Sequence, residues 1–234
     1  MSASRSTRLP PEERREQLVQ LGLELFGRSA PDQVSIGDIA RAAGISKGLL
    51  YHYFPTKSDF VVAVLRQSRD ELERRMRPDD RGAGPLAGLD QSLDAFLGYA
   101  DEHAAGYLAV VRARGGEDEA IRAVLLEGRR RRVAAMVGFA AALAGSPREE
   151  LSSPALDTAI EGWLSFCEGV VARWLAERDL DRDAVLHLLR GALLSAYASV
   201  AALDARPACA RLAAAARAAA GASTAETTAG LATG

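Results

Sequence analysis

Apolar residues recur along most of this chain at spacings of three and four residues, which is the period of one face of an α-helix. The first such set is Leu18, Leu21, Leu25 and Phe26, in a segment that a pair of prolines opens. The same spacing continues in the segments 86–103, 105–114, 117–144, 154–177 and 181–203. The pattern predicts an all-α fold.

Residues 44–57 differ from these longer helical segments. Gly44 interrupts an apolar helix, and Ser46 is placed to cap a new helix by accepting from the N–H groups of its first turn. Pro55 disfavours helix at the residue before it, so the second helix has only about two turns. A helix, a glycine turn and a short second helix are typical of a helix-turn-helix.

The short second helix has two different faces. Leu50 and Phe54, four residues apart, lie on the side that we expect to be buried. Lys47, Tyr51 and His52 point the other way. A basic and aromatic face on such a helix favours a reader of DNA.

The helix before the glycine turn has a recognisable start. Ser35 is its expected cap, and Asp38 three residues later completes a near capping box. Ile36, Ile39 and Ala43 would then close a three-helix core with the first helix and with the buried side of the short helix.

Residues 34–57 carry a sequence signature. Asp-Ile-Ala, Ala-Gly-Ile-Ser, Leu-Tyr-x-x-Phe and a final Lys stand in register over 24 residues. The stretch resembles the DNA-binding signature of TetR-type (tetracycline-repressor-like) transcription regulators. The resemblance implies a three-helix DNA-binding head followed by a helical bundle for ligand binding and dimerisation.

The resemblance also implies which residues contact DNA. Ser35 and Ile36 are expected at the DNA backbone, Lys47 at guanine in the major groove, and Lys57 at phosphate. The full implied set is Ser35, Ile36, Ser46, Lys47, Gly48, Leu49, Tyr51, His52 and Lys57.

Two positions depart from the family's pattern. Gly37 offers no side chain where some relatives read a base. Leu49 replaces a common polar residue, and two roles stay open for it: contact with a thymine methyl, or packing. Base specificity therefore falls on few side chains, and the operator sequence is not predictable.

The resemblance suggests how the chain divides. Residues 1–57 are the expected helix-turn-helix domain, with its motif at 34–53. Residues 58–206 are the expected ligand-binding and dimerisation domain, whose first helix links it to the head. Residues 207–234 are rich in Ala, Thr and Gly, so we expect a low-complexity tail with one helix over 208–220 and disorder after it.

Small residues recur on one face of each of the last two long helices. A glycine inside a helix costs about 1 kcal/mol relative to alanine, so close helix–helix approach is the natural compensation. Pairing with a symmetry mate in a four-helix bundle, which the resemblance implies, and close packing within one subunit both stay open. The expected dimer residues are Gly162, Ser165, Gly169, Ala172, Gly191, Ser195 and Ala198.

Aromatic and sulfur-containing residues in the second part of the chain form a candidate effector pocket. A large apolar cavity with a few polar groups is how proteins hold small molecules, although ordinary core packing would place the same residues inward. The candidates are Phe96, Tyr99, His103, Tyr107, Met136, Phe139, Trp163, Phe166 and Cys167. No phosphate loop, nucleophile elbow or metal motif occurs in the sequence, so we expect no enzyme activity, cofactor or metal.

The net charge is informative only when it is counted separately for the two parts of the chain. The whole chain has a net charge of −2, but residues 1–57 hold eight Lys or Arg against six Asp or Glu. A mildly basic head on an acidic remainder suits DNA binding through a small surface. Two widely spaced cysteines and the lack of an apolar run or signal peptide favour a cytoplasmic protein without a membrane partner.

The resemblance thus implies a repressor that binds pseudo-palindromic double-stranded operator DNA as a homodimer and is released by a small-molecule effector of unknown identity. Three alternatives stay open. In the first, the regulator has no small-molecule effector and is controlled by a protein partner. In the second, the chain is an apolar-ligand carrier or an enzyme whose head is vestigial. The third is a thiol sensor that acts through Cys167.

Overall fold

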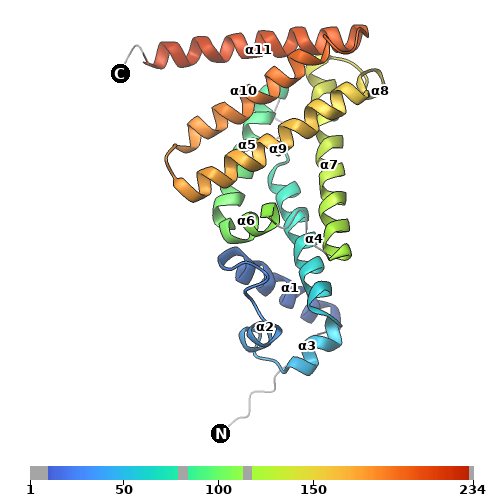
Figure 1. Ribbon diagram of the computed structural model, residues 1–234, viewed down its shortest axis with the longest axis vertical. Coiled ribbons are helices and arrows are strands. Elements are labelled where there is room, and N and C mark those ends of the chain that lie inside the picture. The colour runs from blue at the N-terminus through green and yellow to red at the C-terminus, as the bar shows by residue number, and fades with distance from the viewer. Residues whose placement is uncertain (1–9, 79–83, 113–117, 232–234) are drawn as a thin grey trace. The chain divides into compact units, whose positions relative to one another are not determined.

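The computed structural model describes residues 10–78, 84–112 and 118–231, with side chains followed to residue 222 at the C-terminal end. Within these ranges all regular structure is helical and no strand occurs, which confirms the all-α prediction (Figure 1). The helices are α1 (Pro11–Arg28), α2 (Ile36–Ala42), α3 (Lys47–Tyr53), α4 (Lys57–Arg75), α5 (Gly84–Glu102), α6 (Ala104–Arg112), α7 (Glu119–Ala144), α8 (Arg148–Leu151), α9 (Pro154–Glu177), α10 (Arg182–Val200) and α11 (Pro207–Leu231).

The described residues form two compact units. The first comprises the chain up to Glu71 together with Glu102–Leu126, and the second comprises Leu72–Asp101 together with the chain from Glu127 onward. The first unit therefore holds α1, α2 and α3 and also α6, while α4 and α7 each contribute to both units.

The first unit is built around aromatic contacts between helices. The Phe60 ring of α4 meets the Phe26 ring of α1 edge-on at 5.9 Å and the Phe54 ring at 5.1 Å, measured between ring centroids. Aromatic rings prefer this edge-to-face arrangement. The buried apolar residues of this core are Leu18, Val19, Leu23, Phe26, Val34, Ile39, Ala40, Leu50, Phe54, Phe60, Val61, Ala63 and Val64.

The buried face of α1 includes the predicted Leu18 and Phe26, and it is centred on Gly22. A Cβ at Gly22 would lie 2.7 Å from Phe60 Cζ and would also overlap Val64, so the missing side chain lets α4 approach α1. Leu21 and Leu25, which the spacing predicted to be inward, are half-buried, and Leu25 packs against this core.

Helix α6 packs against α1 through glycines within the same unit. A Cβ at Gly106 would lie 2.7 Å from the carbonyl oxygen of Phe26, and a Cβ at Gly27 would lie 3.1 Å from His103 Nδ1. Backbone therefore meets backbone almost directly at this contact. This contact was not predictable from the sequence, because the partners are far apart along the chain and one of them has no side chain.

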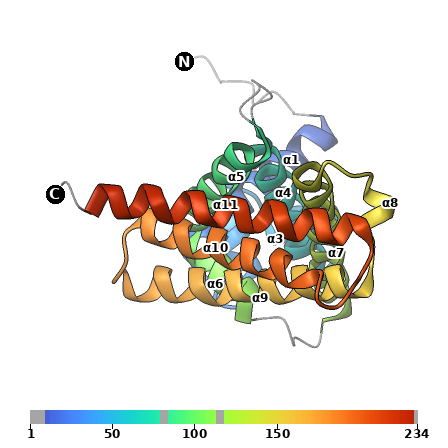
Figure 2. The ribbon, with the colours of Figure 1, turned by 90° about the horizontal axis from the view of Figure 1, so that it is seen from above.

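In the second unit, α9 and α10 run side by side, and α11 lies along α10 (Figures 1 and 2). The indole N–H of Trp163 donates to the Leu189 carbonyl at 2.9 Å, which ties α9 to α10. The Tyr197 hydroxyl of α10 donates to the Met136 carbonyl of α7 at 2.8 Å. Buried polar groups of aromatic side chains are thus satisfied by backbone carbonyls.

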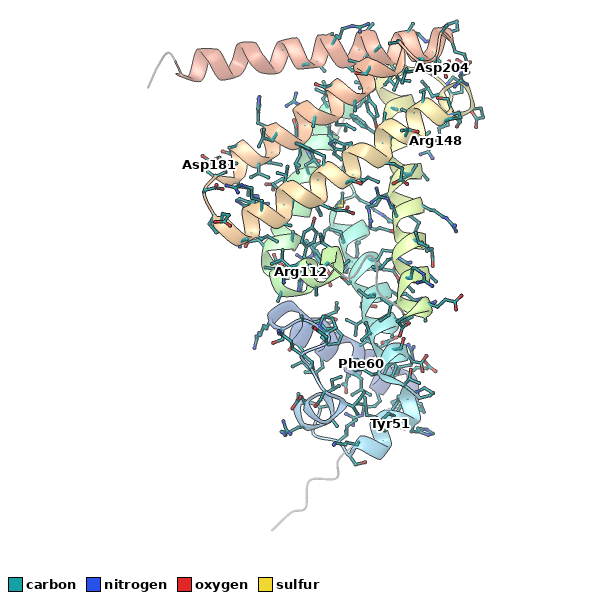
Figure 3. The ribbon with its side chains drawn as sticks, viewed as in Figure 1. Tyr51, Phe60, Arg112, Arg148, Asp181 and Asp204 are labelled. Atoms are coloured by element: carbon teal, nitrogen blue, oxygen red, sulfur yellow. The ribbon has the colours of Figure 1, made fainter. Side chains whose placement is uncertain are left out.

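The starts of α9 and α10 are capped by their own flanking residues. Ser153 Oγ accepts from the Leu156 N–H at 3.2 Å, and Asp181 Oδ1 accepts from the Ala184 N–H at 2.7 Å (Asp181 is labelled in Figure 3). The bounds of α9 agree with the predicted segment 154–177.

Two expectations for the last part of the chain were wrong. Helix α11 runs to Leu231 and not only to residue 220, because its first turns are anchored by packing on α10 and each further residue then extends a helix that already exists. The segment between the predicted helical segments 117–144 and 154–177, for which no helix was predicted, contains the single turn α8. The buried residues of α11 are Ala208, Cys209, Leu212, Ala213, Ala216 and Ala219.

Among the helices of the described residues, none combines the length and the apolar character that a membrane span needs.

Candidate nucleic-acid interface

The start of α2 is fixed by the predicted capping box. Ser35 Oγ accepts from the Asp38 N–H at 3.2 Å, and Asp38 Oδ2 accepts from the Ser35 N–H at 3.1 Å. The Asp38 carboxylate also accepts from Arg41 at 2.8 Å. The Ser35 hydroxyl, and after it Arg41, lowers the pKa of Asp38 from 3.8 to about 2, so this carboxylate is ionised near neutral pH.

The turn between α2 and α3 also has the predicted geometry. Gly44 has a φ of +64°, a conformation that residues with a Cβ rarely adopt. Ser46 then caps α3, since its Oγ accepts from the Leu49 N–H at 3.1 Å.

Helix α3 is divided into a buried side and an exposed side, as the sequence predicted. Leu50 and Phe54 are almost fully buried in the core of the first unit. On the other side Leu49 is 40% exposed and Tyr51 is 47% exposed, and Lys47, Gly48 and His52 are exposed as well (Tyr51 and Phe60 are labelled in Figure 3). Packing therefore does not account for Leu49, which leaves its methyl groups available to a partner.

The segments on either side of α3 hold the remaining residues that the resemblance implied to contact DNA. Ile36 packs against the core, so its main chain rather than its side chain is left for a DNA backbone contact. Lys57 opens α4, where Thr56 and Asp59 form a second reciprocal cap: Thr56 Oγ1 accepts from the Asp59 N–H at 3.0 Å and Asp59 Oδ2 accepts from the Thr56 N–H at 3.0 Å. The residues that the resemblance implied thus all belong to one unit and lie on or beside α2, α3 and the start of α4.

The candidate pocket residues are not all brought together. His103 and Tyr107 belong to the first unit, whereas the other candidates belong to the second. Phe139 stacks on Tyr197 with ring centroids 6.1 Å apart, and Tyr197 was not among the predicted pocket residues. Phe166 is 41% exposed on α9.

Cys167 is buried, and this burial, followed by the charge of Glu168, raises the pKa of its thiol to about 12. A thiol that stays protonated at neutral pH is a poor nucleophile. The structure therefore gives no support to a thiol sensor at this residue.

A cavity of about 470 Å³ opens on the second unit between α7, α8 and α9. Its apolar floor comes from α7, and charged side chains surround it, including Arg148, which lies across Gly138 (Arg148 is labelled in Figure 3). None of the aromatic candidates lines this cavity. Its lining residues are Arg130, Val133, Ala134, Val137, Arg148, Ser152, Asp157 and Glu161.

The small-residue face of α9 and α10 is open. Within the described part of the chain, a Cβ placed at Gly162, Gly169 or Gly191 would have no neighbour within 4 Å outside its own helix. Phe166 and Leu188 beside them are each 41% exposed. Close packing within one subunit, the alternative that the sequence left open, does not explain these glycines.

Residues 129–132 of α7 are four consecutive arginines, and most of them form ion pairs inside the second unit. Arg129 binds Glu161 and Glu168 of α9, and its Nη2 donates to Ser165 Oγ at 2.9 Å. Arg131 binds Glu127 at 2.9 Å on the same helix. These contacts favour a structural role for the run.

Comparisons with known proteins agree with this geometry. Residues 18–64 match the sequence pattern described as "Bacterial regulatory proteins, tetR family", and residues 85–195 match "Tetracyclin repressor-like, C-terminal domain". The crystal structure of a tetR-family transcriptional regulator from Streptomyces coelicolor is similar, with a TM-score of 0.72 and 32% identity over 89% of each chain.

Two regulators of Mycolicibacterium smegmatis are similar over shorter stretches. The HTH-type transcriptional activator FasR is 32% identical over 104 residues, which are 44% of this chain and 48% of FasR. The HTH-type transcriptional repressor KstR2 is 38% identical over 80 residues, which are 34% of this chain and 39% of KstR2. The chain thus spans less than half the length of either regulator. The similar proteins are transcriptional regulators, so they lend no support to a carrier or an enzyme.

The capping box of α2 should make the pKa of Asp38 low and dependent on Ser35. A ¹³C NMR titration of the Asp38 carboxyl should give a pKa of about 2, below the ordinary 3.8. Because the folded pKa is lowered, the stabilisation that this carboxylate contributes is fully present above about pH 4 and is lost as the pH falls toward about 2.

The two partners of Asp38 provide the controls for that titration. Ser35→Ala should return the pKa toward 3.8 more than Arg41→Ala does, because the hydroxyl is the larger cause. An unchanged pKa in Ser35→Ala would contradict the capping box.

Proposed function

Because the chain belongs to the TetR family of transcriptional regulators, we propose that it is a repressor that binds a pseudo-palindromic operator as a homodimer and is released by a small-molecule effector. The observation that carries the DNA-binding part is the exposed side of α3, held on the buried Leu50 and Phe54. A helix of this size fits the major groove of B-DNA. We propose that this regulator acts in the cytoplasm, on chromosomal DNA.

The exposed residues supply different kinds of DNA contact. Lys47 is the donor for guanine O6 or N7, and Gly48 lets the helix approach the base edges without a side chain between them. Tyr51 and His52 reach phosphate or a base edge. Lys57 meets phosphate, and the N-terminal end of the long helix α4 favours the same negative charge.

The dimer is supported by the open face of α9 and α10. Glycines that cost helix stability, together with exposed Phe166 and Leu188, suit a second copy of the same face. An interface of two such faces is a four-helix bundle with twofold symmetry. Two heads held in this way would sit in successive major grooves, roughly 34–36 Å apart.

Effector control is supported by the packing of α6 in the first unit. Gly106 meets the Phe26 carbonyl, so a displacement of α6 acts directly on the helix that carries the core of the head. A coupling free energy of about 1–3 kcal/mol between effector and DNA is typical of such regulators. Repression is the direction of control that we propose, and the similar regulators include both a repressor, KstR2, and an activator, FasR.

The packing of the second unit favours one alternative, a regulator controlled by a protein partner. Phe139 stacks on Tyr197, and the Trp163 indole is engaged by the Leu189 carbonyl. These candidate pocket residues are therefore part of a packed core, and a small molecule among them has to rearrange it.

Substitution of the two lysines of the candidate DNA interface should change DNA binding in different ways. Lys47→Ala should lose preference among operator sequences, by roughly tenfold at one base pair. Lys57→Ala should weaken binding to all sequences alike and flatten the slope of log affinity against log salt by about one unit. Equilibrium binding to operator and scrambled duplexes over a salt series measures both. Equal effects of the two substitutions would contradict these roles.

An arginine on the open face of α9 should break the dimer, because it brings two like charges together in a close interface. Gly169→Arg should convert the dimer to a monomer of unchanged helical content, as measured by light scattering and circular dichroism. Ala210→Arg, at an exposed position of α11, is the matched control and should stay dimeric. If the Gly169→Arg protein remained dimeric, the dimer interface would not include this face of α9.

An effector that binds the aromatic candidates should change the fluorescence of Trp163. The chain has two tryptophans, so Trp174→Phe leaves Trp163 as the sole reporter. Compounds from a panel that raise the melting temperature should also shift Trp163 emission and release the operator. Release without any change in Trp163 emission would exclude this pocket, and a panel without any active compound would favour the protein-partner alternative.

A further inference from the structure

The backbone conformation at position 37 does not require a glycine. Gly37 is the second residue of α2, and within the described chain the glycines with positive φ are Gly44, Gly84 and Gly145. Its conformation is thus one that alanine adopts readily, and alanine is the better helix former. The reason for glycine at this position has to be the space beside it.

That space is occupied by the end of the Lys47 side chain. A Cβ at Gly37 would lie 3.0 Å from Lys47 Cε and 3.2 Å from Lys47 Nζ, with Ser35 Oγ at 3.5 Å. Lys47 is the first residue of α3, so its side chain reaches back over the first turn of α2. Contacts of 3.0–3.2 Å are tighter than ordinary van der Waals contact, so a Cβ at this position requires the end of the Lys47 side chain to shift by at least a few tenths of an ångström.

We propose that Gly37 is a positioning residue for Lys47: by leaving the first turn of α2 bare, it lets the Lys47 ammonium lie there and read one base pair of the half-site from the α2 side. This inference rests on the proposed function, because it assigns a role in DNA selectivity. It also gives a physical reason for the missing side chain at Gly37. The reading group at this place is supplied by α3 and not by α2.

The same geometry makes the substitution a clean test. The atoms that a Cβ would meet are the far end of a flexible lysine, which moves at little cost, so Gly37→Ala should keep the fold and gain helix propensity. Gly22→Ala would be different, because its Cβ would meet the buried Phe60 ring. An effect of Gly37→Ala on DNA selection is therefore not an effect of unfolding, and a melting temperature no lower than that of the wild type checks this.

The position of Lys47 can be followed without DNA. Lys47 and Lys57 are the only lysines of the chain, so protein labelled with ¹³Cε-lysine gives two assignable signals. Gly37→Ala should shift the Lys47 signal and leave the Lys57 signal in place. Gly48→Ala is the matched control, because its Cβ would meet only Ser46 Oγ, at 3.9 Å, and the Lys47 signal should stay closer to that of the wild type.

Selection from a library of randomised half-sites then tests the functional part, with the full-length wild type, Gly37→Ala, Lys47→Ala and the double variant. Gly37→Ala should relax the preference at one base pair by roughly tenfold, and this should be the base pair at which Lys47→Ala acts. If Gly37 acts through Lys47, the double variant should match Lys47→Ala at that base pair.

The possible results separate the two claims. A Gly37→Ala protein with wild-type preference, or a double variant with additive losses, overturns this inference while the proposed function stands. A wild-type protein that selects no sequence overturns the proposed function and this inference with it.

Discussion

The burial of Leu50 and Phe54 is the constraint on which the candidate DNA surface depends. Helix α3 has 7 residues, and helices shorter than about 12–15 residues are marginal in water by themselves. It persists because Ser46 caps its first turn and because these two side chains enter the core. Phe54 is in turn fixed by the edge of Phe60 at 5.1 Å. The orientation of Lys47, Tyr51 and His52 is therefore set by core packing, although none of the three contributes to it.

Local features of the head could be predicted from the sequence, because each depends on residues within one turn of each other. The Ser35–Asp38 box, the positive φ of Gly44 and the cap at Ser46 all follow from short-range hydrogen bonding and sterics. The two faces of α3 follow from helical periodicity in the same way. Features that join distant parts of the chain were not predictable, since nothing in a single sequence pairs Gly106 with Phe26 or Tyr197 with Phe139.

Glycines illustrate this limit most clearly. In the sequence, Gly22, Gly106 and Gly162 are alike, as glycines inside helical segments. In the structure the first two are contact points where a side chain would overlap Phe60 or the Phe26 carbonyl, while the third has open space around it. An absent side chain leaves no hydrophobic signal, so periodicity centred the buried face of α1 on leucines. The cost of glycine in a helix shows that something compensates, but only the three-dimensional surroundings show whether it is an internal neighbour or an open face.

The contact between α6 and α1 limits how a signal can reach the DNA surface. His103 and Tyr107 belong to the same compact unit as α3, so a molecule that binds them acts inside the unit that carries the interface. A Cβ at Gly106 would overlap the Phe26 carbonyl oxygen, so the absent side chain allows α6 to lie as close to α1 as it does. In the proposed effector control, a displacement of α6 would act on α1 through this contact. Overpacked or displaced contacts of this kind cost about 1–3 kcal/mol, which is the range of free energy that couples an effector to DNA binding. A displacement at this single contact would therefore have a free-energy cost comparable to the coupling that the proposed effector control requires.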